Sequence, residues 1–412
     1  MQKIIVRGGN PISGHVRVSG SKNAALPVIF ASLLVPDVTV IDNVPEIGDV
    51  SVALEIITRL GAKINRSGNR LFIDATHLEY SSPREDLISK IRASTYLIGA
   101  SLARFGVADI GEFGGCNFSS RPIDFHLMAA EALGARREGK RLFAKRLYGA
   151  KIHLPKPSVG ATINAAIMAA CAVGETEIFG FAREPHVFAL FDFLSSIGVF
   201  IEIGENSVKI RSGALHKTEF TIIGDMIEAG TYLIMPLVCG GSITVSGIVP
   251  GELSSLTDAL LSIGYKPMIC KDAIFIDSRI KSQAEIERLS ITASPYPGFP
   301  TDLQPIITTL LSKFGGTVTD SVWQERFGYL KPLGKMGLRY SLESGIAKIE
   351  KGSFHPASVT APDLRGGMAL LIAALSANGE SEILSSDLIL RGYDHLIDKL
   401  SCLGAEIKIV NL

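Results

Sequence analysis

The fold is indicated most clearly by one short stretch, Ile56-Ile57-Thr58-Arg59-Leu60-Gly61-Ala62-Lys63-Ile64. This stretch is typical of a helix that ends at a leucine and a glycine and leads into a strand. Glycine is a common helix C-cap because it adopts the left-handed conformation at little cost. The pattern returns at intervals of 64 to 73 residues, around Gly134, Gly198, Gly264, Gly337 and Gly404. This spacing predicts six copies of a unit of about 70 residues, which together account for the 412-residue chain.

A second pattern recurs in phase with the first, an apolar helix followed by a turn and a short β-branched strand. The helices are expected to begin near Asn23, Ala93, Ala161, Glu228, Asp302 and Leu364. The strands that follow are expected at residues 38–41, 107–110, 176–178, 242–245, 317–319 and 381–383. Helices of period 3.6 and strands of period 2 define an α/β protein. One unit buries too little surface to be stable alone, so we expect two domains of three units each.

The order of elements indicates how the chain is divided. A first strand, over about residues 3–20, precedes the first apolar helix, and the phase of the pattern changes near Met226–Glu228. We therefore expect a catalytic domain of residues 1–20 plus 227–412, with its first strand swapped in from the N-terminus. Residues 21–226 form the second domain, which carries a cysteine loop. No Pro- or Ser-rich linker marks the boundary, so the chain is expected to cross between the domains twice.

Composition excludes several classes of protein. Forty-one basic residues balance 41 acidic ones, which argues against a polycation that binds nucleic acid. The longest apolar helix candidates, near residues 24–35 and 367–377, are shorter than the roughly 18 residues of a membrane span. Five widely separated cysteines predict neither a disulfide framework nor a metal site. The N-terminus lacks the apolar segment of a secretory signal, so we expect a cytoplasmic protein.

Polar residues gather where the six apolar helices begin. Helix N-termini favour anions, so a cleft on which these helix starts converge would suit a phosphorylated substrate. Ordinary N-capping explains Asp225 and Asp363 equally well. Lys22 and Arg92 oppose the helix dipole, and a bound anion explains them better than solvated surface does.

A glycine-rich segment over residues 111–126 contains Gly114-Gly115 followed directly by Cys116. Arg121 lies close enough in sequence to lower the pKa of the thiol, which favours a reactive thiolate. A lone loop cysteine is more often inert, and that alternative stays open on spacing alone. His126 is expected to be a structural residue of the following helix. The sequence shows no catalytic-triad order, metal-ligand spacing or phosphate-binding glycine loop.

Several segments together follow one known family in order. They are 19–27 (Ser-Gly-Ser-Lys-Asn-Ala-Ala-Leu-Pro), the Gly114–Asp124 loop, 157–162, 297–304, 363–365 and 391–393. The chain resembles the UDP-N-acetylglucosamine 1-carboxyvinyltransferases, the enolpyruvyl transferases that begin peptidoglycan precursor synthesis. The resemblance spans nearly the whole chain. It implies two inside-out α/β domains, each of three βαβαββ-type units, with the active site in the cleft between them.

The resemblance also implies a reaction and its residues. The enolpyruvyl group of phosphoenolpyruvate would pass to the 3-hydroxyl of UDP-N-acetylglucosamine, with release of phosphate and without a metal or cofactor. Lys22, Arg121 and Arg391 would bind phosphoenolpyruvate. Cys116 would donate a proton and react with fosfomycin, and Asp302 would face the sugar 3-hydroxyl. The implied contacts of the UDP-sugar are Asn23, Arg92, Arg121, Pro122, Ile123, Asp124, Phe125, Lys156, Pro157, Ser158, Val159, Asp302 and Val322, and Asp363 and Arg365 match further cleft residues.

Some positions depart from the family pattern. Met226 stands where arginine is common, Gln324-Glu325 replaces Glu-Asn, and Ser119-Ser120 replaces Gly-Ala. These departures leave open a paralogue with another nucleotide or shikimate-type acceptor, or a silent relative that binds a UDP-sugar. 5-Enolpyruvylshikimate-3-phosphate synthase itself is disfavoured because it lacks the Gly-Gly-Cys loop. We expect no nucleic-acid or membrane partner, and the oligomeric state is left open.

Overall fold

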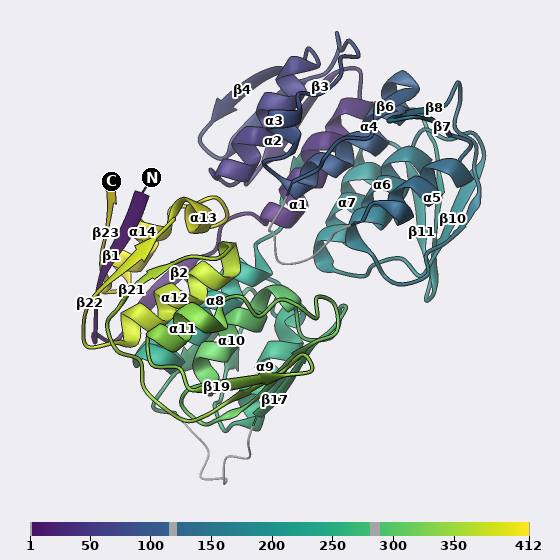
Figure 1. Cartoon of the computed structure of the whole chain (residues 1–412). Helices are drawn as coiled ribbons and strands as arrows, with labels where there is room; N and C mark the ends of the chain where they lie inside the picture. Colours follow the sequence, from purple (N-terminus) through teal and green to yellow (C-terminus); the bar gives the residue numbers. More distant parts are fainter. Residues whose placement is uncertain (1, 115–121, 281–288, 412) are drawn as a thin grey trace. The chain divides into compact units, whose positions relative to one another are not determined.

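The computed structural model describes residues 2–114, 122–280 and 289–411 (Figure 1). The chain divides into two compact units. The first unit holds the chain up to Ser19 and from Gly224 onward, and the second holds the described residues between Gly20 and Ile223. The two connecting segments are paired, because the Ser21 N–H donates to the Ile223 carbonyl (2.7 Å) and the Asp225 N–H to the Ser19 carbonyl (2.9 Å).

Apolar helices form the centre of each unit. They are α1 (Lys22–Ala31), α4 (Tyr96–Phe105) and α6 (Val159–Ala169) in the second unit, and α8 (Met226–Cys239), α10 (Gln304–Leu311) and α12 (Leu364–Ser376) in the first. Short 3-10 turns precede two of them, η2 (Arg92–Thr95) and η4 (Thr301–Leu303). A helix that is apolar all round must lie inside, and α12 is buried continuously from Leu364 to Leu375. The predicted helix starts are confirmed.

Three small sheets surround the helices of the second unit. Their strand orders are β13-β3-β5-β4, β6-β8-β7 and β11-β12-β10-β9. The strands are β3 (Val38–Asp42), β4 (Lys63–Ser67), β5 (Arg70–Asp74), β6 (Val107–Asp109), β7 (Arg136–Glu138), β8 (Arg141–Phe143), β9 (Lys151–His153), β10 (Glu175–Phe179), β11 (Phe200–Ile203), β12 (Ser207–Arg211) and β13 (Glu219–Thr221). The remaining helices are η1 (Ser32–Leu34), α2 (Gly48–Arg59), α3 (Glu85–Ile88), α5 (Asp124–Ala132) and α7 (Pro185–Ser196).

The first unit repeats this plan with sheets β15-β16-β14-β2, β17-β18-β20-β19 and β21-β22-β1-β23. Its strands are β1 (Gln2–Gly8), β2 (Gly14–Arg17), β14 (Ser242–Ser246), β15 (Met268–Ile269), β16 (Ala273–Asp277), β17 (Leu289–Ala293), β18 (Gly316–Asp320), β19 (Tyr340–Glu343), β20 (Ile346–Ile349), β21 (Ser358–Thr360), β22 (Gly379–Leu384) and β23 (Glu406–Asn411). Its other helices are η3 (Pro250–Leu253), α9 (Ser254–Ser262), α11 (Leu330–Lys335), α13 (Asp387–Leu390) and α14 (Leu396–Cys402). Burial alternates along β14 and β18, as expected for sheets with one face on the core. The inside-out α/β architecture expected from the sequence is therefore present.

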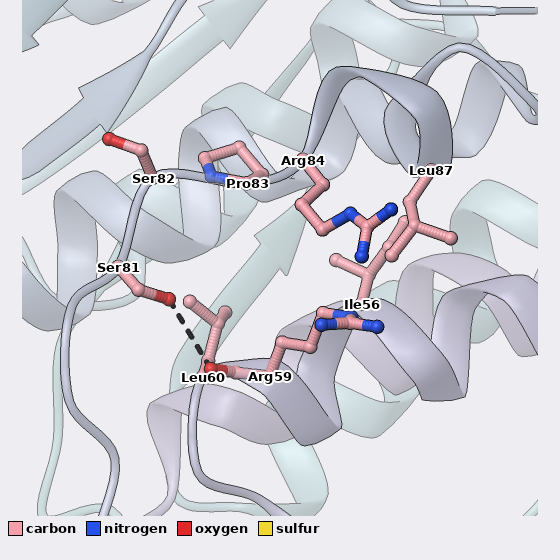
Figure 2. Close-up of a pocket in the computed structure, with 8 residues that line it drawn as sticks. All are labelled: Ile56, Arg59, Leu60, Ser81, Ser82, Pro83, Arg84 and Leu87. Carbon is pink, nitrogen blue, oxygen red and sulfur yellow. Dashed lines mark hydrogen bonds between the residues drawn. The ribbon is translucent and has the colours of Figure 1, made fainter.

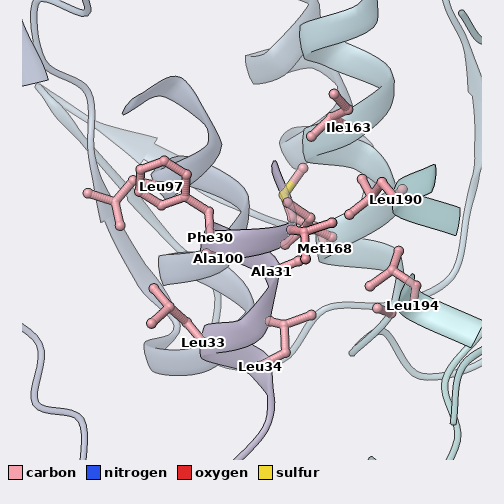
Figure 3. Close-up of a cluster of buried hydrophobic side chains, with 14 of the residues drawn as sticks. Phe30, Ala31, Leu33, Leu34, Leu97, Ala100, Ile163, Met168, Leu190 and Leu194 are labelled. Carbon is pink, nitrogen blue, oxygen red and sulfur yellow. The ribbon is translucent and has the colours of Figure 1, made fainter. Parts of the chain in front are cut away.

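The core of the second unit shows why the helices lie inside. Phe30 of α1, Leu97 of α4, Ile163 and Met168 of α6 and Leu190 of α7 meet in one buried cluster (Figure 3). Each of these side chains is at most 4% exposed. Burying aliphatic and aromatic side chains of this size contributes roughly 1.5–3 kcal/mol each, so contacts between helices contribute strongly to the stability of the unit.

The six glycines that close the repeats have the left-handed conformation predicted for them. Their φ angles lie between 85° and 103°, a region that strains other residues. They are Gly61, Gly134, Gly198, Gly264, Gly337 and Gly404. Each follows a helix and precedes an edge strand of its sheet, so the repeat read from the sequence is the repeat of the structure.

The expectation of one strand over residues 3–20 is wrong. This segment forms two strands that enter different sheets. β1 lies between β22 and β23 and is antiparallel to both, whereas β2 pairs in parallel with β14. Gly9 has a φ of 98°, and Pro11 has no N–H to donate, so a strand cannot continue through this turn. Among the described residues, no helix combines the length and apolarity needed to cross a membrane.

Candidate active site

Asp302, which begins the α10 region on η4, is held by two arginines. Its Oδ1 accepts a hydrogen bond from Arg326 Nη1 (2.8 Å), and its Oδ2 accepts from Arg365 Nε (3.2 Å) and Nη2 (3.1 Å). The Asp302 side chain is 28% exposed, whereas the arginine side chains are 5% and 2% exposed. Two buried guanidinium groups thus fix the orientation of one accessible carboxylate and favour its ionised form.

The turn after β18 supplies the first of these arginines. Asp320 Oδ1 accepts the backbone N–H groups of Val322 (2.9 Å) and Trp323 (2.8 Å), and Asp320 Oδ2 accepts from Thr301 Oγ1 (2.5 Å). Arg326 Nη1 also donates to Thr301 Oγ1 (3.1 Å). Val322, a predicted contact of the UDP-sugar, therefore lies half-buried in the turn that connects β18 to the Asp302 site.

Two other predicted residues serve as helix caps. Asp363 Oδ1 accepts the N–H groups of Arg365 (2.9 Å) and Gly366 (3.0 Å) at the start of α12. Asp225 Oδ1 accepts those of Ile227 and Glu228 at the start of α8. The capping interpretation of both residues is confirmed. Arg365 was expected to be a further cleft residue, but its side chain is 2% exposed and it contacts Asp302.

Lys22, at the start of α1, has a carboxylate partner that the sequence did not predict. Its Nζ lies 3.1 Å from Oδ2 of Asp49 in the first turn of α2, and the two side chains are 14% and 7% exposed. The carboxylate offsets the unfavourable charge at the helix N-terminus, so the cation alone no longer requires a bound anion. Asp49 was missed because nothing in the local sequence relates it to Lys22.

Most of the other predicted residues of the second unit lie near the starts of α5 and α6. Arg92 Nη2 donates to the Pro122 carbonyl (3.4 Å), and Ser158 caps α6 by accepting from the Ala161 N–H. His126, directly after Phe125, packs against Gly160, where an added Cβ would lie 2.9 Å from the imidazole. Segments 122–125 and 156–159 are therefore brought together.

His126 itself has the structural role expected of it. It is 5% exposed, and its Nδ1 lies 2.6 Å from Nδ2 of Asn164 in α6. Asn164 in turn accepts from the Gly99 N–H and donates to the Thr95 carbonyl. Burial lowers the pKa of His126 to about 4, so the imidazole is neutral at pH 7.

For several other predicted residues, only their exposure or their place in the chain is described. Asn23 lies half-buried in the first turn of α1, Arg391 follows α13, and Lys156 and Pro157 are exposed before α6. Cys116 and Arg121 lie outside the described residues, as do Ser119 and Ser120.

A buried ion pair lies at the start of α8. Lys399 Nζ is 2.6 Å from Glu228 Oε1 and 2.6 Å from Ser19 Oγ, and Glu228 Oε2 accepts the Ser19 N–H (2.9 Å). The Glu228 and Lys399 side chains are 5% and 16% exposed. Burial raises the pKa of Glu228 to about 7, although Lys399 acts in the opposite direction. This pair anchors the residue at which the chain leaves the first unit.

A cavity of about 380 Å³ lies elsewhere, between α2 and residues 81–87 (Figure 2). It contains none of the predicted site residues; its lining is Ile56, Arg59, Leu60, Ser81, Ser82, Pro83, Arg84 and Leu87. Arg59 is paired with Glu55 (3.1 Å) and Arg84 with Asp86 (2.8 Å). Because each arginine is neutralised locally, this cavity is a poor candidate for an anionic substrate.

Arg326 was not among the site residues predicted from the sequence, and Tyr393 had no predicted role. Tyr393 is 2% exposed, and its ring lies 5.2 Å from the Arg365 guanidinium carbon. A sequence signal for Arg326 existed, since the large apolar residue Phe327 follows it in a segment otherwise typical of an exposed turn.

Comparison with known proteins identifies relatives along the whole chain. The family model for EPSP synthase (3-phosphoshikimate 1-carboxyvinyltransferase) matches residues 6–400. A UDP-N-acetylglucosamine 1-carboxyvinyltransferase of Caldanaerobacter subterraneus is 41% identical and one of Streptococcus agalactiae is 39% identical, with at least 99% of both chains covered in each case. The enolpyruvyl transferase NikO of Streptomyces tendae has a similar structure, with a TM-score of 0.89 and 25% identity over 100% of this chain and 99% of that one. An EPSP synthase of Acinetobacter baumannii shares the fold at a TM-score of 0.73 and 16% identity, with both chains fully covered.

Proposed function

The chain belongs to the EPSP synthase family, the enolpyruvyl transferases, and from that premise we propose that it transfers the enolpyruvyl group of phosphoenolpyruvate to the 3-hydroxyl of UDP-N-acetylglucosamine. The observation that carries this proposal is the 39–41% identity, over the full chain, to enzymes named for that reaction. EPSP synthase shares only 16% of its residues with this chain, which disfavours a shikimate acceptor.

The reaction is an addition followed by an elimination. The sugar 3-hydroxyl oxygen bonds to C2 of phosphoenolpyruvate while C3 gains a proton. C3 then loses a proton and the bond from C2 to the phosphate oxygen breaks, which leaves an enol ether and inorganic phosphate. An acceptor at the hydroxyl and a donor at C3 are both required.

Asp302 is the acceptor in this scheme. Its carboxylate is accessible, and the two guanidinium groups on its oxygens favour the ionised form. It therefore accepts the hydrogen bond of the 3-hydroxyl, orients that oxygen for attack on C2 and takes up the hydroxyl proton as the bond to C2 forms. Cys116 donates the proton to C3, and its thiolate accepts the proton that C3 loses in the elimination.

Cations bind the second substrate. Phosphoenolpyruvate carries a phosphate and a carboxylate, and Lys22, Arg121 and Arg391 hold these groups while charge shifts to the departing phosphate. The segments joined by the contact between His126 and Gly160 bind the UDP-sugar, and the N-termini of α5 and α6 favour its anionic diphosphate. In the cell, the product feeds peptidoglycan synthesis in the cytoplasm, and fosfomycin inhibits the step.

Phosphate release tests the proposal. The protein is incubated with phosphoenolpyruvate and either UDP-N-acetylglucosamine or shikimate 3-phosphate, and the product is weighed by mass spectrometry. We expect turnover with the UDP-sugar only, and loss of turnover in Asp302→Asn. Asp277→Asn is the matched control, because Asp277 pairs with Arg279 (2.7 Å) on β16. Turnover with shikimate 3-phosphate alone, or with neither acceptor, contradicts the proposal.

A further inference from the structure

The geometry points to Tyr393 as a positioning residue that holds Asp302 in its reactive orientation by supporting Arg365. One line of contacts in the first unit runs from α8 through Tyr393 and Arg365 to Asp302. The effect on turnover rests on the proposed function, whereas the contacts themselves stand without it.

Arg365 is the first link. Its guanidinium is buried, donates to Asp302 Oδ2 through both Nε and Nη2, and lies over the Tyr393 ring at 5.2 Å. Burial opposes this charge, yet Tyr393, Asp302 and Asp225 outweigh burial and raise the pKa of the guanidinium. A guanidinium that forks onto one oxygen is sensitive to tilt, because both N–H groups must point at that oxygen. The Tyr393 ring, over which the Arg365 guanidinium lies, therefore sets the direction in which the two N–H groups point.

Tyr393 is fixed in turn by Thr231 in α8. The Tyr393 hydroxyl lies 2.9 Å from Thr231 Oγ1, and Thr231 Oγ1 donates its own proton to the Ile227 carbonyl (2.7 Å). A threonine hydroxyl has one proton, so in the Tyr393–Thr231 bond the tyrosine donates. The phenol is thus held in one direction by a helix whose first turn is capped by Asp225.

Arg326 and Arg365 together hold the Asp302 carboxylate in one orientation. Arg326 occupies Oδ1 while Arg365 occupies Oδ2, so a turn of the carboxylate weakens the bonds to both arginines. A displacement of a reacting group by about 1 Å costs up to about a hundredfold in rate. Loss of the Tyr393 hydroxyl allows a smaller shift, and we expect Tyr393→Phe to lower kcat about tenfold.

The chain offers a matched control. The Tyr329 hydroxyl lies 2.9 Å from Thr308 Oγ1, and Tyr329 is 0% exposed. Like the contact of Tyr393 with Thr231, this one joins a buried tyrosine to a threonine in a helix of the first unit. Tyr329→Phe removes the same group at the same depth. We expect both variants to lose similar stability and only Tyr393→Phe to lose turnover. Thr231→Val should resemble Tyr393→Phe, and Thr231→Ser, which keeps the hydroxyl, should restore wild-type turnover.

A double-mutant cycle tests the contact without reference to activity. Urea midpoints are measured for Tyr393→Phe, Asp302→Asn and the double variant, and for the same cycle with Tyr329→Phe. We expect non-additive midpoints for Tyr393 with Asp302 and additive midpoints for Tyr329 with Asp302. Additivity in the first cycle overturns the inference, as does equal turnover of the two phenylalanine variants. If the wild-type protein is inactive with both UDP-N-acetylglucosamine and shikimate 3-phosphate, the proposed function is overturned instead. The double-mutant cycle in urea still decides whether Tyr393 supports Asp302.

Discussion

Replacing Lys399 by methionine tests the buried pair at the start of α8. Methionine has a similar length but leaves Glu228 without its cation, and Ser19 Oγ loses a donor. The folded pKa of Glu228, about 7, exceeds its usual 4.5, so the wild-type protein loses stability as pH rises from about 4.5 to 7 and is level above. Without Lys399 the carboxyl stays protonated to about pH 8–9, as documented for buried glutamates.

The expected loss of unfolding free energy in Lys399→Met follows from the different pKa of Glu228 in the two proteins. At pH 5.5 Glu228 is mostly protonated in both proteins, and Lys399→Met loses hydrogen bonds worth about 1 kcal/mol. Between pH 7 and 8.5 the stability of the variant continues to fall by about 1.4 kcal/mol per pH unit, or about 2 kcal/mol in all, while the wild type is level. We therefore expect a loss of about 1 kcal/mol at pH 5.5 and about 3 kcal/mol at pH 8.5, close to the range for a broken buried pair.

Urea unfolding at the two pH values measures this loss. The single tryptophan, Trp323, lies in the same unit, so its fluorescence reports the relevant transition. Lys3→Met is the matched control, because Lys3 Nζ also lies 2.6 Å from a carboxylate, Glu382, but at a partly exposed site. It should cost under about 1 kcal/mol. An equal loss for Lys399→Met at both pH values, or a loss no larger than that of Lys3→Met, refutes the reasoning.

Three further predictions concern the proposed site. Lys22→Ala should lower turnover, because a cation that binds substrate is lost, and should lower Tm, because the Asp49 carboxylate loses a cation partner. Adding Asp49→Asn to this variant should recover Tm but not turnover. Recovery of turnover in the double variant would count against a substrate role for Lys22. The contribution of buried, neutral His126 to the stability of the second unit should fall by about 3 kcal/mol from pH 6.5 to 4, because the unfolded chain takes up a proton that folded His126 does not. Urea titrations of that unit in His126→Asn should lack this contribution. An unchanged slope in that variant would assign the loss to other groups. Fosfomycin should label Cys116 and not Cys239, because burial raises the pKa of Cys239 to about 12; peptide mapping that finds the adduct elsewhere contradicts the assignment.

Sequence predicted those parts of the fold that depend on local patterns. The six apolar helices follow from unbroken apolar runs, and the closing glycines follow from the conformation a helix end needs. The division of residues 3–20 into two strands was missed, because β1 pairs with strands from the far end of the chain. The periodicity of a sequence segment does not indicate which distant strand will pair with it.

The candidate site divides in the same way. Asp302 was identified from a motif, but its two arginines lie 24 and 63 residues further along the chain. The pairing of Lys22 with Asp49 spans 27 residues and crosses from one helix to another. Partners of this kind are set by how helices pack, so only the assembled unit shows which charges meet.

The place of β1 has a consequence for how the protein is made. Its partners are the last of the described strands to be synthesised, since Gln2 lies opposite Asn411 and Lys3 opposite Leu384. At about 5–20 residues per second, synthesis separates these partners by roughly 20–80 s. The second unit lies wholly between them and has all its strands long before that sheet closes. During this interval an apolar segment, with Ile4 and Val6 destined for the core, stays unpaired on the nascent chain, and exposed apolar segments of this kind are prone to aggregate.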